Sequence, residues 1–166
     1  MKIKRLVTIS LLAAFCFVAT FIHIDFGRNM VHLGTAALYI SAVLVGEDAG
    51  WVGAVGLGMF DLLTYSASWA PFTFIIKGLQ GLAAGKIAFL NKKEGNSVVQ
   101  NLIGFIVGAI ISLIGYFLVD WLVFYNFGTA LTSSLASIIT SIIGIIISIV
   151  LTTAIKPILK KAKITF

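Results

Sequence analysis

The sequence predicts an all-α integral membrane protein, with six transmembrane helices in a single domain, 1–166. The first observation is composition, since 60% of the residues are hydrophobic, 11% are charged and the mean hydropathy is +1.09. A soluble domain has about 25% charged residues, so this chain has too few charges to cover a water-exposed surface. The second observation is a series of apolar runs, several of them near the ~20 residues that a helix needs to cross a bilayer.

The apolar runs place the six helices along the chain. The four longer runs predict helices at 6–22, 71–90, 98–124 and 132–155. Two shorter runs, 32–46 and 50–64, are separated by the sequence Gly-Glu-Asp-Ala. Each short run would be roughly 22 Å long at 1.5 Å per residue. The two short helices either cross a region where the membrane is thinned or the helices are well covered by protein, or they form a hairpin that enters the membrane from one side. Both arrangements leave the topology of the later helices unchanged.

The positions of lysine and arginine orient these helices. Ten basic residues fall on one side if both termini are cytoplasmic: Lys2, Lys4, Arg5, Lys86, Lys92, Lys93, Lys156, Lys160, Lys161 and Lys163. The opposite side has three loops, 23–31, 65–70 and 125–131, in which Arg28 is the one basic residue. The net charge of +6 is therefore explained by basic residues at the membrane surface, and no nucleic-acid partner is expected. Cys16 is a single cysteine and cannot form an intrachain disulfide.

Small residues recur every four positions on several predicted helices. Such spacing puts them on one helix face, where they allow two backbones to approach closely. We expect most of them to pack inside the bundle, and the remainder to pack against another protein. The stripes are Gly50, Ala54 and Gly58; Gly81 and Gly85; Gly104, Gly108 and Ser112; and Ala136, Thr140, Gly144, Ser148 and Thr152.

Three ionisable residues lie inside the predicted helices, in the half away from the lysine-rich side. Lys77 is six residues past Pro71, about 9 Å along its helix. Asp61 is at a matching depth, and Asp120 lies one turn from Tyr116. Ionisable groups within membrane helices face the bundle interior or a water-filled cavity, and they pair. One interpretation is an Asp61–Lys77 ion pair that fixes helix register, and the other is a polar ligand cavity that opens outward. The two overlap, because an ion pair can also line a site.

Aromatic and amide side chains at a comparable depth favour the cavity. Aromatic walls with a few convergent polar groups suit a small, flat, polar molecule. The candidate substrate-binding residues are Asn29, His32, Tyr39, Asp61, Tyr65, Trp69, Lys77, Gln80, Trp121 and Asn126, with Tyr125 nearby. The alternative for the tryptophans and tyrosines is the ordinary aromatic belt at the membrane interface. The alternative for His32 is that it caps or orients the second helix.

The sequence contains no catalytic constellation. It has no His-Glu-x-x-His zinc motif, no Gly-x-Ser-x-Gly elbow and no phosphate-binding glycine loop with a lysine. It has two histidines and one cysteine, so we expect no metal site, no cofactor and no enzyme activity. Three function classes remain: a solute-binding subunit, a stand-alone secondary transporter of a small polar aromatic solute, and a channel fragment. A secondary transporter would place protonatable groups through the full depth of the bundle, and here the inner halves have almost none.

Residues 31–87 resemble the S components of energy-coupling factor (ECF) vitamin transporters. The similar features are His32-Leu33-Gly34 opening the second helix, a small-residue third helix ending near Asp61, and Trp69-Ala70-Pro71 before a helix with Lys77-Gly78. The resemblance is to the subgroup associated with hydroxymethylpyrimidine or vitamin B6. It implies a substrate-binding subunit in a bacterial cytoplasmic membrane, which captures one vitamin from outside.

The resemblance also implies partners and a docking surface. An S component docks on a transmembrane coupling subunit that carries two ATPase subunits, and is thought to topple in the membrane to release its cargo. Docking in the family uses small residues on the first helix, and here the nearest match is Ser10 and Ala14. Serine replaces the usual alanine at the first position. The alternative is that these two residues pack within the bundle.

Overall fold

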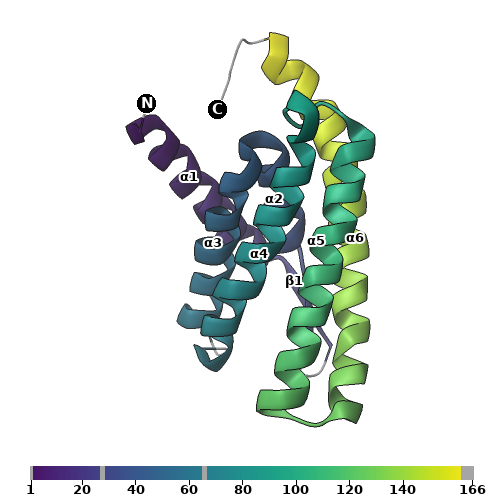
Figure 1. The fold of residues 1–166 in the computed structure, drawn as a ribbon. Coiled ribbons are helices and arrows are strands. Elements are labelled where there is room, and N and C mark those ends of the chain that lie inside the picture. Colours follow the sequence, from purple (N-terminus) through teal and green to yellow (C-terminus); the bar gives the residue numbers. More distant parts are fainter. Residues whose placement is uncertain (1, 27–28, 65–66, 162–166) are drawn as a thin grey trace.

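The protein is an elongated bundle of helices, shown in Figure 1. The computed structural model describes residues 2–26, 29–64 and 67–161. Its α-helices within these ranges are α1 (Lys2–Thr20), α2 (Gly34–Val45), α3 (Ala49–Leu63), α4 (Ala70–Ala88), α5 (Val98–Val119) and α6 (Phe127–Lys161). Short 3₁₀ turns are formed by Gly46–Asp48, Ala67–Trp69 and Leu90–Lys92, and a π-helical turn by Asp120–Phe124 continues α5. Each predicted helix is present, with ends shifted by a few residues.

Helix α2 lies at the centre of the molecule and is buried on all sides. Every residue from Gly34 to Val43 is buried, as expected for a helix that is apolar all round. Leu38, Tyr39 and Val43 pack with Phe105 of α5 in the main hydrophobic core. Helix α4 packs between α3 and α5 and also touches α2, while α6 covers α2 and α5. The core therefore joins α2 to helices from both halves of the chain.

Four segments of the described chain are long and apolar enough to cross a membrane. They are Ile3–Thr20, Gly34–Leu63, Val98–Phe124 and Phe127–Ile158, and the second contains both α2 and α3. Helix α4 is absent from this set because Lys77, Gln80 and Lys86 interrupt its apolar sequence. The structure thus supports a helical membrane protein with four candidate spans, two fewer than the sequence predicted.

The fold is helical, as predicted, with one addition: a short β-hairpin lies in the first predicted outer loop. Strands β1 (His23–Phe26) and β2 (Asn29–His32) pair antiparallel, with His23 opposite His32 and Ile24 opposite Val31. Two four-residue strands give too short a pattern to distinguish from a loop. The hairpin leads directly into α2, which is only 12 residues long. Strand β2 packs against α6, and in Figure 1 the hairpin lies in the half of the bundle away from the α2–α3 connection.

Close backbone contacts confirm that the small-residue stripe of α4 packs inside the bundle. A Cβ atom on Gly85 would fall on the carbonyl oxygen of Gly46, and one on Gly81 would fall on that of Ala49. Gly46 begins the turn between α2 and α3, and Ala49 is the first residue of α3. Glycine at these two positions therefore lets α4 lie directly against the α2–α3 hairpin.

Helix α1 is attached to the bundle by its second half. Ala13 and Cys16 are buried against the hairpin of α2 and α3, whereas Ser10 and Ala14 are exposed. The first turns of α1 project away from the other helices in Figure 1. Arg5 ties this end to the bundle, with Nε donating to Asp48 Oδ2 at 2.6 Å and Nη2 donating to Oδ1. The exposure of Ser10 and Ala14 contradicts the alternative that they pack within the bundle.

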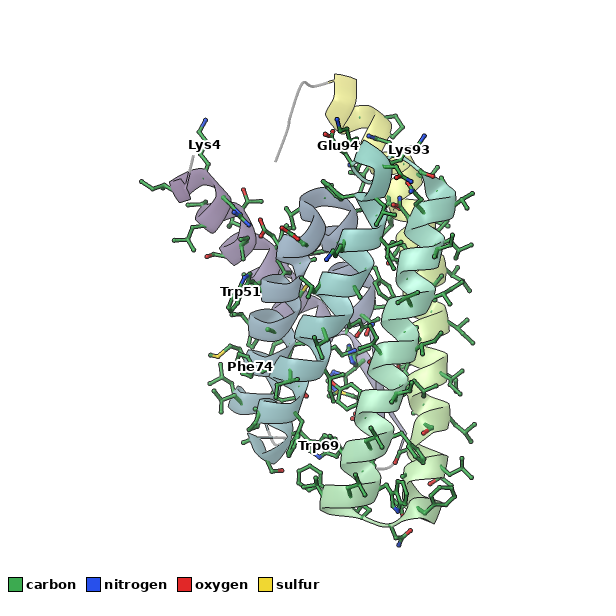
Figure 2. The ribbon with its side chains drawn as sticks, viewed as in Figure 1. Lys4, Trp51, Trp69, Phe74, Lys93 and Glu94 are labelled. Atoms are coloured by element: carbon green, nitrogen blue, oxygen red, sulfur yellow. The ribbon has the colours of Figure 1, made fainter. Side chains whose placement is uncertain are left out.

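The two ends of the bundle differ in composition. Figure 2 shows Lys4 and Lys93 at one end, near the start of α1 and the end of α6, and Trp69 at the other. We refer to the Lys93 end as the inner end and to the Trp69 end as the outer end. The separation of charge from aromatic groups agrees with the distribution expected from the sequence.

Replacing Gly85 by alanine should destabilise the protein. The added methyl overlaps the Gly46 carbonyl, and overpacking of this kind costs about 1–3 kcal/mol of unfolding free energy. Gly78→Ala on the same helix is the matched control, because its Cβ would lie 3.4 Å from that of Ala54. Unfolding of both variants in detergent should be followed by circular dichroism. Equal stability of the two variants would contradict the close packing.

Candidate functional site

A polar cavity of about 150 Å³ lies toward the outer end of the bundle. It is enclosed by the end of α1, strand β2, the first turn of α2, and the outer parts of α3, α4, α5 and α6. Most of its lining side chains carry a hydroxyl, a charge or an aromatic ring. The lining residues are Thr20, Met30, His32, Thr35, Leu57, Asp61, Trp69, Thr73, Lys77, Ser112, Tyr116, Asp120, Tyr125, Ser133, Ala136, Ser137, Thr140 and Ser141.

Lys77 forms the inner wall of this cavity. Its side chain is 4% exposed, and its Nζ donates to three neutral acceptors. These are Gln80 Oε1 at 2.9 Å, Thr35 Oγ1 at 3.3 Å and Ser112 Oγ at 3.3 Å. The acceptors come from α4, α2 and α5, so the three protons of one ammonium group join three helices. Nζ also lies 5.4 Å from the ring centroid of Tyr116, a favourable cation–π distance.

A second layer of hydrogen bonds holds Gln80 behind Lys77. Gln80 Nε2 donates to the Tyr39 hydroxyl at 2.8 Å, and that hydroxyl donates to the Phe105 carbonyl at 2.9 Å. Gln80 and Tyr39 are fully buried, and the ring of Tyr39 stacks on that of Phe105 at a centroid distance of 4.5 Å. Neither side chain reaches the cavity wall. Both support Lys77, although the sequence had suggested that they contact the ligand.

Asp61 has its own partners and does not pair with Lys77. Thr73 Oγ1 donates to Asp61 Oδ2 at 2.5 Å, and the Tyr116 hydroxyl donates to Thr73 Oγ1 at 3.2 Å. Among the described residues, ion pairs join Arg5 to Asp48 and His23 to Asp25, not Lys77 to Asp61. The ion pair, which was one of the two interpretations of the sequence, is therefore not formed in this structure. Hydroxyl and amide groups between the two charges satisfy each of them separately.

Asp120 adds a second buried carboxylate near the mouth of the cavity. It begins the π-helical turn, in which the Tyr125 N–H donates to the Asp120 carbonyl at 2.7 Å. Its side chain is 5% exposed and is hydrogen-bonded to Ser133 of α6. Single π turns in α-helices are frequent at functional sites. Here the wider turn belongs to the segment that supplies both Asp120 and Tyr125 to the cavity.

His32 lines the cavity and has an unsatisfied, buried ring nitrogen. It ends β2, two residues before α2, and its Nδ1 is buried without a hydrogen-bond partner in the described part of the chain. The residue at the start of α2 that could cap it, Leu33, makes no side-chain cap hydrogen bond. His32 thus does not cap α2, which was the alternative explanation. Buried polar atoms are rarely left unpaired, so a ligand or a water molecule is a candidate partner for this nitrogen.

Aromatic rings form the outer wall. Trp69 packs on Phe124 of the π turn at a centroid distance of 4.5 Å and on Tyr116 at 6.0 Å. Figure 2 shows Trp69 at the outer end of the molecule. The cavity therefore runs from an aromatic mouth to a hydrogen-bonded ammonium group.

The structure brings four of the predicted residues together around the cavity: His32, Asp61, Trp69 and Lys77. Trp121 is partly exposed and packs on Phe117 and Phe127, away from the cavity. Asn126 is exposed at the start of α6, where its Oδ1 accepts from the Thr129 N–H at 3.0 Å. Tyr65 and the side chain of Asn29 lie outside what the structure describes.

Sequence reasoning missed the hydroxyl-bearing part of the lining. From the sequence, Ser112 and Thr140 are expected in packing stripes, and Asp120 and Tyr125 are expected at the depth of the cavity but are not among the candidate binding residues. Other missed residues are Thr20, Thr35, Thr73, Tyr116, Ser133, Ser137 and Ser141. One signal was present, because α6 repeats serine and threonine along the same face as its small residues. Such a face can pack against a helix or line a polar cavity, and the pattern alone does not distinguish the two.

The arrangement suits reversible binding of a small polar ring. The aromatic mouth allows ring stacking. The deeper wall provides an ammonium donor, two carboxylate acceptors and several hydroxyl groups that can each donate or accept a hydrogen bond. With Asp61 and Asp120 ionised and Lys77 protonated, the three groups together have a formal charge of −1. No nucleophile in the described lining is hydrogen-bonded to a histidine base.

Two comparisons with known proteins bear on this site. A protein from Pyrococcus woesei, described as an uncharacterized protein in a gap 3′ region, is 31% identical over 104 residues. The aligned part covers 62% of this chain and 67% of that protein. The family model described as "ECF-type riboflavin transporter, S component" matches residues 1–157. Since that match includes α1 to α5, nearly all of α6 and the whole cavity lining, the chain belongs to the family of ECF-type riboflavin transporter S components.

Proposed function

We propose that this protein captures a small, unphosphorylated, water-soluble vitamin with one aromatic ring and presents it for ATP-driven uptake. Membership of the family makes it a substrate-binding membrane subunit of an ECF transporter, not an enzyme. The observation that carries the choice of ligand is the cavity, with its aromatic mouth and its buried Lys77. A hydroxymethylpyrimidine or a pyridoxine-type vitamer is the proposed substrate.

The cavity volume favours a single ring. An engineered protein cavity of about 150 Å³ binds benzene, and the cavity here has the same volume. Riboflavin, which the family description names, has three fused rings and a polyhydroxylated chain. It is the second candidate, and it requires the mouth near Trp69 to open. Both candidates share ring nitrogens and hydroxyl groups that match the polar lining.

The charges of the cavity favour the free vitamin over its phosphate ester. Asp61 and Asp120 are both buried in the lining and both oppose an entering phosphate. Lys77 offsets only one of these two charges, so an entering phosphate would meet a net negative lining. A neutral ring with hydroxyl groups needs no such compensation. We assign ring stacking to Trp69, and hydrogen bonding to His32 and to Lys77, whose 3.3 Å hydrogen bonds to Thr35 and Ser112 give way to the ligand.

For the membrane arrangement, we infer six crossings with both termini cytoplasmic. Helix α4 reaches from the outer to the inner end, and its polar Lys77 and Gln80 are 4% and 0% exposed, so lipid does not meet them. Helix α2 is too short to cross alone, and the β-hairpin that precedes it extends its path to the outer end. The lysines of the inner end support the cytoplasmic side.

The exposed face of α1 is the proposed docking surface for the coupling subunit, which carries two ATPase subunits. Ser10 and Ala14 are one turn apart, exposed and small, which permits close approach of a partner helix. Their neighbours Ala13 and Cys16 face the bundle. Helix α1 therefore has one face that packs on the bundle and another face that is free for a partner.

A panel of ligands tests the substrate assignment. The purified chain in detergent should bind hydroxymethylpyrimidine or pyridoxine more tightly than the matching phosphate ester, and more tightly than riboflavin. Isothermal titration calorimetry measures each affinity. Tighter binding of riboflavin would overturn the single-ring proposal, and tighter binding of the phosphate ester would overturn the charge argument. Solute uptake by the chain alone, driven by a proton or sodium gradient, would favour a secondary transporter instead.

Replacing Lys77 by methionine should weaken vitamin binding by about tenfold or more. A hydrogen bond to a charged group contributes about 1.5–3 kcal/mol, and each 1.4 kcal/mol is a factor of ten. Lys86→Met is the control, because Lys86 lies on the same helix but is exposed at the inner end. Calorimetric affinity should be compared with the unfolding temperature without ligand. Unchanged affinity in a folded Lys77→Met protein would show that Lys77 does not contribute to vitamin binding.

Tryptophan substitutions at adjacent positions test the docking surface. Ala14→Trp should preserve folding and vitamin binding but abolish co-purification with the coupling subunit and ATP-dependent uptake. Ala13→Trp should instead overpack the core, costing about 1–3 kcal/mol, and impair folding and binding together. Vitamin binding and co-purification should be measured on both variants. Normal transport by Ala14→Trp would exclude this docking surface.

A further inference from the structure

A second cavity, of about 280 Å³, lies at the inner end between α5 and α6, far from the vitamin cavity. Its floor and walls include Gly95, Val98, Asn101, Ile149, Lys156 and Pro157. Pro157 lies inside α6 and cannot donate an N–H to the preceding turn, so the helix is weakened where it borders this cavity. The proposed vitamin site uses none of these residues.

Lys156 brings a cation to the cavity, and the Glu94 carboxylate acts on it at longer range than an ion pair. Lys156 Nζ donates to the Glu94 carbonyl at 2.5 Å and lies 5.9 Å from the ring centroid of Phe89. Among the described residues, no carboxylate forms an ion pair with Lys156, and the Glu94 side chain is exposed. An ammonium group has three protons, so Lys156 retains donors for an anion.

A buried acceptor in the same cavity lacks a donor. Asn101 is 3% exposed, and its Nδ2 donates to the Gly95 carbonyl at 2.9 Å, which fixes the orientation of the amide. Its Oδ1 has no hydrogen-bond partner among the residues that the structure describes. Buried polar atoms are rarely left unpaired. A ligand that enters here should therefore carry a hydroxyl or another donor as well as a negative charge.

The position of the cavity indicates the source of that ligand. Val98, in the cavity lining, and Ile158, directly after Pro157, are exposed apolar residues, and Lys93 is exposed at the same inner end of the bundle in Figure 2. With the inner end at the cytoplasmic face of the membrane, as proposed above, the cavity lies at the level of the lipid headgroups. The 22-residue helix α5 begins at its edge and directs the positive end of its dipole there. Val98 and Ile149 supply an apolar wall.

We propose that this cavity binds the headgroup of an anionic phospholipid that carries a hydroxyl, of the phosphatidylglycerol type. Lys156 and the first turn of α5 hold the phosphate, and Asn101 Oδ1 accepts from a headgroup hydroxyl. The glycerol backbone and the first part of an acyl chain lie along Val98 and Ile149. The site anchors the ends of α5 and α6 at the inner surface of the membrane.

Native mass spectrometry of the full chain in detergent tests the charge requirement. Phosphatidylglycerol should bind more tightly than phosphatidylcholine. Lys156→Gln should weaken phosphatidylglycerol binding by about fivefold, the factor that corresponds to ~1 kcal/mol per lysine near a lipid surface. Lys93→Gln, an exposed lysine at the same end, is the matched control and should retain wild-type affinity. Equal losses in both variants would indicate general surface attraction and overturn the site.

The hydroxyl requirement is tested by changing the lipid. Phosphatidylmethanol has the same charge as phosphatidylglycerol but no headgroup hydroxyl. The wild-type protein should prefer phosphatidylglycerol by about two- to tenfold, the range expected for one hydrogen bond, and Asn101→Leu should abolish that preference. An unchanged preference in Asn101→Leu would overturn the assignment of Asn101. Displacement of the lipid by free glycerol phosphate at equal concentration would assign the site to a soluble phosphate ester and overturn the lipid proposal.

Discussion

The buried ammonium group of Lys77 sets the arrangement of the helices around it. A charge at this depth in a membrane protein must be enclosed and hydrogen-bonded, because lipid offers no acceptor. Thr35, Gln80 and Ser112 supply three acceptors from α2, α4 and α5. Each acceptor fixes the register of its helix relative to the lysine. The hydrogen bonds continue through Gln80 and Tyr39 to a carbonyl of α5, so the inner wall of the cavity is fixed in two layers.

The short α2 is a consequence of this constraint. Thr35 lies in the first turn of α2, and it must reach the level of Lys77. The helix therefore begins in the interior of the bundle, and the chain reaches it through the β-hairpin. A full-length helix in this position would fill the space with a turn of side chains. Instead, β2 brings Met30 and His32 to the cavity, and the polar space between the hairpin, α4 and α6 stays open.

The sequence predicts the helices well because long apolar runs have few alternatives in a membrane. It also indicates that Asp61 and Lys77 lie at matching depth, which places both in the cavity. It does not predict their partners, because neutral hydroxyls and amides can satisfy buried charges as well as opposite charges can. Thr73 and Gln80 each lie one turn or less from Lys77 on α4, and they take the roles that an ion pair would have had.

The sequence indicates the depth of a side chain but not the direction in which it points, and this explains why some predicted residues do not line the cavity. Trp121 follows Asp120 by one position, so the two side chains leave the helix about 100° apart, and only one of them can face the cavity. Asn126 is at the right depth, but it lies at the start of α6, where an amide side chain commonly caps the backbone. The hairpin was missed for another reason, since two strands of four residues give no period long enough to detect. Direction depends on tertiary packing, which a single sequence does not contain.

Helix α1 connects the two functional surfaces proposed for this protein. Thr20, at its end, lines the vitamin cavity, while Ser10 and Ala14 lie on its exposed face. Cys16, between them, is buried beside Ser41 of α2. A ligand changes docking only if it binds the docked and free states with different affinity. A contact between ligand and Thr20 would provide such a difference, because any shift of α1 against α2 and α3 moves its exposed face relative to the bundle. The physical route from cavity to docking surface is therefore one rigid helix, held at its far end by Arg5 and Asp48.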